Sequence, residues 1–224
     1  TAVGAGAMAC NTTGHANTAV GRISMFNNTT GTCNVAVGFC ALSANTDGFN
    51  NAAFGLKALR LNTTGDCNTG VGYAGGSEGV SGNNNHSFGY DANPSSNSVS
   101  NQITLGNGAN DNLRCADTSI SSLSDLRDKK NIKDIPHGLD YILALRPVKF
   151  DWNTRDGTRI GKKDYGFIAQ ELDKVEQDFG SAEYTRLVHK ENPEQWEADV
   201  MKTYPILIKA IQELKAEIEE LKKK

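Results

Sequence analysis

The first part of the sequence is short of charged residues. Residues 1–123 contain four basic and six acidic side chains, whereas residues 124–224 contain 19 basic and 20 acidic ones. Neither part is basic overall, which argues against non-specific binding to nucleic acid. No apolar run approaches the roughly 18 residues that a membrane-spanning helix needs. Residues 1–20 also lack the charged start and apolar core of a signal peptide. We expect neither a nucleic-acid partner nor membrane insertion.

The cysteines show no pattern of a metal site or of a disulfide framework. They are odd in number, lack CxxC spacing and all precede Ser124: Cys10, Cys33, Cys40, Cys67 and Cys115. Zinc sites need clustered ligands, and disulfide frameworks usually show an even count. We interpret the cysteines as free thiols in a reducing compartment and expect no metal and no cofactor.

A strict 17-residue period runs through residues 1–106. Glycine keeps this period at Gly4, Gly21, Gly38, Gly55, Gly72, Gly89 and Gly106. The residue before each glycine is apolar: Val3, Val20, Val37, Phe54, Val71, Phe88 and Leu105. Two asparagine columns follow the same period, Asn17, Asn34, Asn51, Asn68 and Asn85, and Asn11, Asn28, Asn45 and Asn62. A further apolar column is formed by Met8, Met25, Leu42 and Leu59. Several registers held at once indicate stacked structural units.

Each unit is too short for a helical hairpin, and its pattern favours a β-solenoid. Short apolar runs bounded by glycine and Asn-Thr-Thr-Gly turns are typical of short strands. In stacked coils the backbone groups pair between neighbours, and aligned asparagine amides form ladders. The recurrent glycine indicates a positive φ or a close approach of two backbones. The repeats resemble the head repeats of trimeric bacterial adhesins and the shafts of viral tail fibres.

One coil buries only about two or three apolar side chains, so a single solenoid of this kind has a poor core. Three chains around one axis would bury a second face, and we therefore expect a trimeric β-solenoid. The acids Asp47 and Asp66 do not follow the period. No pair of carboxylates is designated for glycoside hydrolysis, so a rod or binding surface is favoured over an enzyme.

Five asparagines of the repeat lie in Asn-x-Ser/Thr sequons: Asn11, Asn27, Asn28, Asn62 and Asn85. Such sequons can accept N-linked glycans. Most of these, however, belong to the Asn-Thr-Thr-Gly turn of the repeat itself. We therefore favour turn chemistry over glycosylation.

The composition changes after Gly106. Residues 107–123 indicate a polar linker, with one last strand as an alternative, and residues 124–224 indicate an α+β domain. Expected elements of this domain are a helix on Leu139, Ile142, Leu143 and Leu145 ended by Pro147, a strand over 148–152, a strand running into a helix over 165–172, and a strand over 184–189.

The C-terminal residues show a heptad pattern. Apolar residues are spaced alternately four and three apart at Val200, Tyr204, Leu207, Ile211, Leu214, Ile218 and Leu221. Pro205 suits a first helical turn. We expect a long coiled-coil-type helix, and isoleucine and leucine at the seam are compatible with three strands. A single helix packed on its own domain is the alternative.

Three motifs of the second region occur in an order that resembles the peptidase S74 family. They are Ser124-Asp125-x-Arg127-x-Lys129-x-x-Ile132, then Leu-x-Leu-x-Pro-Val-x-Phe-x-Trp over 143–152, then Gly-Phe-Ile-Ala-Gln-Glu-Leu over 166–172. This family is the intramolecular chaperone domain at the end of phage tail spikes, tail fibres and endosialidases. The resemblance covers residues 124–224.

The resemblance implies a domain that trimerises, assists folding of the β-solenoid and then removes itself by cleavage. The bond to be cut is Leu123–Ser124, with Ser124 as nucleophile and Lys129 as base. Asp125 and Arg127 match the motif and are assigned site-organising roles. The chemistry is that of a serine endopeptidase that acts once, in cis.

The residue types suit this chemistry. A serine hydroxyl needs a nearby base to become a good nucleophile. A lysine amine is a base only when neutral, a form favoured by burial or by neighbouring positive charge such as Arg127 and Lys130. Taken alone, Ser124 to Arg127 also fits a helix N-cap with a charged first turn.

The leading interpretation is the C-terminal part of a viral, phage-type tail fibre or spike protein, made in the host cytoplasm and assembled into the virion. Its partners would be two further copies of the chain and a host surface glycan or protein receptor. One alternative is an adhesin-type binding module whose C-terminal domain trimerises without cutting. Another is a glycan-degrading enzyme with a catalytic domain upstream of Thr1.

Overall fold

The computed structural model describes residues 1–110, 112–116, 120–155 and 157–224. The chain divides into two compact units, residues 1–111 and 112–224. Each unit is described by itself. The predicted linker over 107–123 includes residues 111 and 117–119, which lie outside the described residues.

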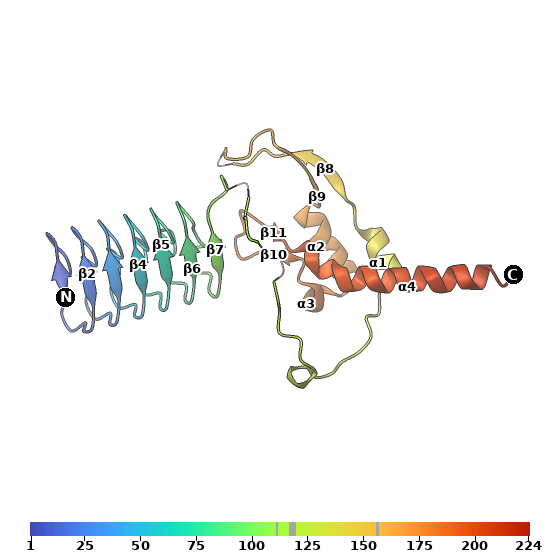
Figure 1. Ribbon diagram of the computed structural model, residues 1–224, viewed down its shortest axis with the longest axis horizontal. Coiled ribbons are helices and arrows are strands. Elements are labelled where there is room, and N and C mark those ends of the chain that lie inside the picture. Colours follow the sequence, from blue (N-terminus) through green and yellow to red (C-terminus); the bar gives the residue numbers. More distant parts are fainter. Residues whose placement is uncertain (111, 117–119, 156) are drawn as a thin grey trace. The chain divides into compact units, whose positions relative to one another are not determined.

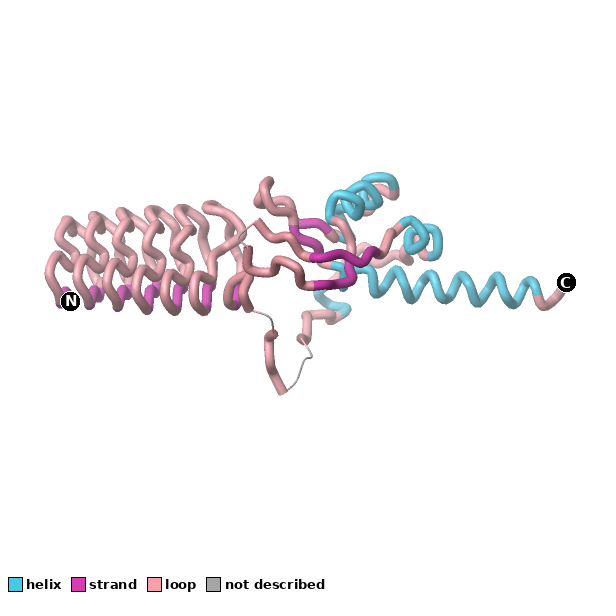
Figure 2. Tube along the Cα trace, turned by 90° about the horizontal axis from the view of Figure 1, so that it is seen from above, coloured by secondary structure: helices cyan, strands magenta, loops and turns pink. Residues whose placement is uncertain are grey.

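The first unit is a β-solenoid, as predicted from the 17-residue period (Figures 1 and 2). Each coil contributes one short strand to a seven-stranded parallel sheet, in chain order. The strands are β1 (Ala2–Val3), β2 (Thr18–Val20), β3 (Val35–Val37), β4 (Ala52–Phe54), β5 (Thr69–Val71), β6 (His86–Phe88) and β7 (Ile103–Leu105). The register shifts by one repeat at each step, so that Val20 is paired with Val37 and Val37 with Phe54.

The interior of the solenoid is narrow and holds small apolar side chains beside buried asparagines. The central residue of a strand points inward, and Ala19, Ala36 and Ala53 are fully buried. Met25 and Leu42 join them in one core cluster. The apolar residue before each repeat glycine points to the other face of the strand, because successive side chains alternate. The valine column is therefore stacked as expected, but on the outside of the coil.

The repeat asparagines form two hydrogen-bonded ladders inside the coils. In one ladder, Asn34 N donates to Asn17 Oδ1 at 2.9 Å, and the Nδ2 of Asn17 donates to the Gly31 carbonyl at 2.7 Å. In the other, Asn45 Nδ2 donates to Asn28 Oδ1 at 2.7 Å. These bonds satisfy backbone groups that a coil without regular secondary structure would leave unpaired. Three of the five sequon asparagines, Asn28, Asn62 and Asn85, are buried, consistent with their interpretation as turn residues.

The repeat glycine is required by the close stacking of coils. Gly21 has a φ of 133°, and a Cβ on it would lie 2.5 Å from the carbonyl oxygen of Gly38. Any other residue would face both an unfavourable backbone conformation and a clash with the next coil. The close approach of neighbouring coils thus explains why this position is glycine, and the glycine recurs once per coil.

The second unit combines short strands with helices. Its elements are η1 (Leu126–Asp128), α1 (Leu139–Ala144), β8 (Val148–Asp151), β9 (Lys163–Gly166), α2 (Ala169–Asp178), α3 (Ala182–Thr185), β10 (Val188–His189), β11 (Glu197–Ala198), η2 (Val200–Thr203) and α4 (Tyr204–Leu221). Strands β8 and β9 form one antiparallel pair, and β10 and β11 form another. The expected α+β composition and the long C-terminal helix are confirmed.

Two local predictions for this unit were wrong. The strand expected over 184–189 begins only at Val188, because Tyr184 and Thr185 end helix α3. In α1, Leu143 is exposed and Tyr141 is buried instead. Tyr141 can be buried because its hydroxyl accepts a hydrogen bond from Ser181 Oγ at 3.2 Å.

Helices α1, α2 and α4 meet in one small core. Its fully or almost fully buried members are Tyr141, Leu172, Val175, Leu187 and Ile206. Helix α4 packs along α1, and its Glu213 Oε2 accepts a hydrogen bond of 2.7 Å from the backbone N–H of Leu139. This bond satisfies one of the N–H groups that the start of a helix leaves unpaired.

Candidate functional site

Residues 124–129 form one tight turn. The chain enters η1 through Asp125, whose Oδ1 accepts a hydrogen bond of 2.8 Å from the backbone N–H of Arg127. It leaves the turn at Lys129, whose N–H bonds back to the Leu126 carbonyl. The helix N-cap that the sequence offered as an alternative interpretation of this segment is present, with Asp125 as the cap. This turn brings the residues on either side of η1 together.

The predicted nucleophile and base are in direct contact. Lys129 Nζ donates a hydrogen bond of 2.6 Å to Ser124 Oγ, across five positions of the chain. A neutral amine at this distance is within reach of the hydroxyl proton. In the structure Lys129 is the donor of this bond, and the transfer of a proton from Ser124 would require the neutral amine at the same distance.

Asp125 and Arg127 form an ion pair beside this contact. Arg127 Nε lies 3.0 Å from Asp125 Oδ1, and a terminal guanidinium nitrogen lies 2.7 Å from Oδ2. The side-chain hydrogen bond from Arg127 holds the pKa of Asp125 below its ordinary value, and Asp125 raises the pKa of Arg127. The two side chains therefore bind each other, and their bidentate pairing restrains the turn.

The turn lies on an exposed arm of the second unit (Figure 1). Every described residue from 112 to 136 is exposed. The Leu123 side chain, on the acyl side of the predicted cut, is 94% exposed. The Leu123–Ser124 bond is thus accessible in the single chain, without a pocket of its own around it.

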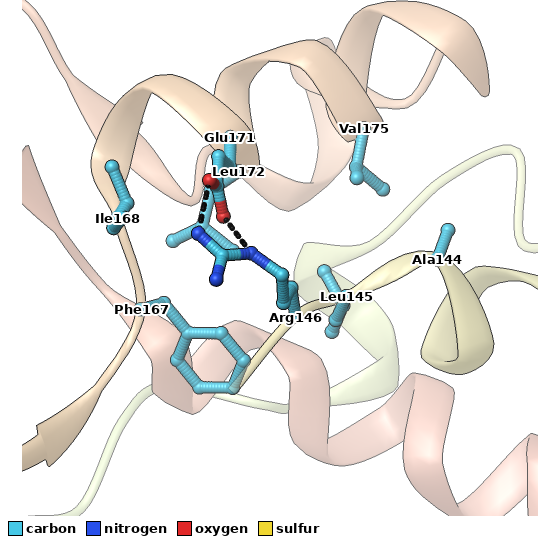
Figure 3. A pocket seen from close by; sticks show the side chains of 8 residues that line it. All are labelled: Ala144, Leu145, Arg146, Phe167, Ile168, Glu171, Leu172 and Val175. Atoms are coloured by element: carbon cyan, nitrogen blue, oxygen red, sulfur yellow. Dashed lines mark hydrogen bonds and ion pairs between the residues drawn. The ribbon is translucent and has the colours of Figure 1, made fainter. Parts of the chain in front are cut away.

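A second contact joins the two downstream motifs (Figure 3). Arg146 Nε lies 3.0 Å from Glu171 Oε2, and its terminal nitrogen bonds Oε1. The pair borders a shallow pocket that Phe167 and Leu172 also line. The hydrogen bond from Arg146 holds the pKa of Glu171 below its ordinary value, while Glu171 raises the pKa of Arg146.

This pairing was not predicted from the sequence. Arg146 occupies one of the unspecified positions of the second motif, and Glu171 is the one acidic residue of the third. The signal in the sequence for this ion pair is that two neighbouring motifs contain one arginine and one glutamate, which have opposite charges. Their bidentate contact ties the start of α2 to the segment between α1 and β8.

No group of three or more histidine, cysteine or acidic side chains able to hold a metal occurs among the described residues. None of the helices in that part of the chain is long and apolar enough to cross a membrane. The cysteines are free thiols, with Cys40 buried and the other four exposed.

Comparison with known proteins supports the interpretation of the second region. Residues 124–181 match the Peptidase_S74 family model, described as the chaperone of endosialidase. The match begins at Ser124 and includes all three motifs, which confirms the S74-type chaperone character of this segment. No curated protein and no solved structure matches the chain significantly.

Proposed function

We propose that this chain is the C-terminal part of a viral tail fibre or spike protein whose last domain releases itself by cutting Leu123–Ser124. The observation that carries the proposal is the 2.6 Å contact between Lys129 Nζ and Ser124 Oγ. It occurs at the first residue of the S74 match, immediately after the region that follows the solenoid. The cut would separate the solenoid from the chaperone domain.

The reaction needs only groups of this chain and water. Ser124 Oγ attacks the carbonyl carbon of Leu123 while its proton passes to Lys129 Nζ. The C–N bond then breaks, the proton passes on to the Ser124 nitrogen, and Leu123 is left as an ester on Ser124 Oγ. Water hydrolyses the ester to a Leu123 carboxylate and a free Ser124 hydroxyl. Each chain reacts once, because the substrate bond belongs to the catalyst.

Asp125 and Arg127 act as positioning residues in this account. Asp125 fixes the turn through the Arg127 backbone, and their ion pair keeps Arg127 beside the site. The turn determines how closely Lys129 approaches Ser124. Neither side chain needs to exchange a proton with the reacting groups.

The C-terminal helix supports assembly as a trimer. Helix α4 uses Ile206 and Ala210, which are 5% and 2% exposed, to pack on its own unit. Its heptad stripe lies on another side of the helix, and Ile211 in that stripe is 59% exposed. The helix thus has one face for its own domain and an unused apolar seam, which suits a coiled coil of three copies.

A trimerising domain would assist the solenoid in folding. Parallel coils depend on contacts between residues far apart in the chain, and these form slowly. Joining three chains at one end raises the effective concentration of the three solenoids and sets their register. After release of the domain, the solenoid trimer would persist because of its barrier to unfolding.

We further propose that the solenoid attaches the virion to a host glycan or protein receptor. An exposed aromatic column supports such a surface. Tyr73 and Tyr90 stack with ring centroids 5.2 Å apart, and Lys57 lies over the Tyr73 ring. Aromatic rings with a nearby cation suit the binding of sugars or of protein side chains.

Expression of the wild type beside Ser124→Ala and Lys129→Ala tests self-cleavage. The wild type should give two fragments of roughly half the 24.0 kDa mass on a denaturing gel. Both variants should remain intact. If the variants still yield the two fragments, the proposed roles of Ser124 and Lys129 are wrong. An intact, trimeric wild type would favour the alternative, a non-cleaving adhesin-type module.

A further inference from the structure

The sheet of the solenoid has an exposed apolar face. Strand register aligns one apolar residue per coil in an outer column: Val3, Val20, Val37, Phe54, Val71, Phe88 and Leu105. Phe54 and Phe88 are 43% and 41% exposed. Parallel sheets are almost always covered on both faces. Here the chain's own core covers one face only.

The inner face becomes thinner along the solenoid. The inward strand residues change from Ala19, Ala36 and Ala53 to Gly70 and Ser87. The column of Met25, Leu42 and Leu59 ends at Gly76. Within residues 60–106, the buried residues with apolar side chains are Ala74, Ala92 and Pro94. The later coils therefore lack the large buried side chains of the earlier ones.

Leu59 marks the end of the internal core. A Cβ on Gly76 would lie 2.6 Å from Leu59 Cδ2, and one on Gly70 would lie 2.9 Å from Leu59 Cγ. Leu59 thus fills the space beside these two glycines. Beyond them the buried positions include Ser87, Ala92 and Pro94, and hold no leucine or methionine. The outer column keeps its large residues through Phe88 and Leu105.

We propose that the coils of residues 69–105 are stabilised mainly between chains, through the outer column packing against two further copies of this chain. The coils of residues 1–62 carry a core of their own and depend on the partners less. This inference rests on the proposed trimer and adds which surface forms it and which coils require it. Burial between chains replaces the burial that the interior of the later coils does not provide.

A second copy is the occupant that the sequence fits best. The outer column repeats with the coil, so copies in register present matching apolar residues at every level. A second column on the same face contains one titratable residue, His86. This column consists of Thr18, Val35, Ala52, Thr69, His86 and Ile103. Like-charge repulsion between identical chains is therefore small on this face. An apolar face of this length is also unusual for a monomer.

Two valines of the outer column provide a matched test. Val20→Ser and Val71→Ser make the same change, one in a coil with its own core and one beyond Leu59. Both are made in the full chain carrying Ser124→Ala, which keeps the units joined. The measurement is amide hydrogen exchange of peptides from each coil. We expect Val71→Ser to accelerate exchange in 69–105 by about tenfold or more, and Val20→Ser to accelerate exchange in 1–37 by less than about threefold.

Light scattering of the same samples tests the proposed trimer separately from the unequal dependence of the coils on it. A monomeric parent protein overturns the proposed trimer and this inference with it. A trimeric parent with equal acceleration for both variants overturns this inference alone. If Val71→Ser does not fold, the milder pair Val20→Ala and Val71→Ala repeats the comparison, with the same order of effects expected.

Discussion

Lys129 Nζ and Ser124 Oγ lie 2.6 Å apart because one 3₁₀ turn brings the two ends of a six-residue segment together. The contact is local, so it requires no other part of the fold. Both residues lie on an exposed arm, at the point where the S74 match begins.

Replacing Lys129 distinguishes a base from a mere cation. Lys129→Arg retains a positive charge but supplies a side chain that stays protonated, and Lys129→Met removes the charge. Both changes should slow cleavage by about 100-fold or more, because general-base catalysis is lost. The appearance of fragments over time provides the rate.

Lys133→Met is the matched control for this experiment, since Lys133 lies four residues further along the same exposed segment and has no assigned role in the site. It should cleave at close to the wild-type rate. Cleavage by Lys129→Arg at the wild-type rate would show that Lys129 is not the base.

The seam of α4 can be tested with two isoleucines. Ile211 is on the heptad stripe and Ile208 is not, although they are 59% and 55% exposed. Ile211→Ser should shift the full chain from trimer toward monomer, because a polar residue weakens a coiled-coil seam. Ile208→Ser should leave the trimer unchanged. Sedimentation or light scattering measures both, and equal effects would count against the seam.

Glu176 should be important for the stability of the second unit. It is 2% exposed, and its Oε1 accepts hydrogen bonds from Thr185 Oγ1 and from the Leu187 backbone N–H. Glu176→Ala leaves the buried Leu187 N–H without its acceptor, while Thr185 Oγ1 keeps its hydrogen bond to the Ser181 carbonyl, and the loss should cost about 1–3 kcal/mol. Glu183→Ala, at an exposed position of α3, is the control and should have little effect on the denaturation midpoint.

The Arg146–Glu171 pair predicts a specific titration. The pKa of Glu171 is lowered by Arg146, so the pair contributes to stability above the ordinary value of 4.5 and is lost as pH falls through the lower, folded-state value. Carboxyl-detected NMR should find the pKa of Glu171 below 4.5 in the wild type. Arg146→Met should return it toward 4.5. An unchanged pKa in this variant would contradict the pairing.

Much of the first unit could be predicted from the sequence. A glycine that every coil needs, such as Gly21, repeats at the length of the coil, so the period reveals the stacking. The asparagine ladders follow from the same period. The orientation of Val20 was harder to predict, because it depends on which of two adjacent strand residues is small enough for the narrow interior, and Ala19 takes that place.

In the second unit, contacts between segments far apart in the sequence could not be predicted from the sequence. The contact of Ser124 with Lys129 is local and was anticipated from the motif. The bonds between Arg146 and Glu171 and between Glu176 and Leu187 join segments that only the tertiary fold brings together. Tyr184 begins the strand predicted over 184–189, but the local backbone forms a helical turn before β10.

The most direct test of the central claim is the N-terminal sequence of the smaller products of the purified wild type. The account predicts a fragment that begins at Ser124, with the sequence Ser-Asp-Leu-Arg-Asp, and a second fragment that ends at Leu123. Intact mass measurement of both fragments provides the same boundary independently. A chain that stays whole after folding and assembly, or a cut at any other bond, would contradict the account.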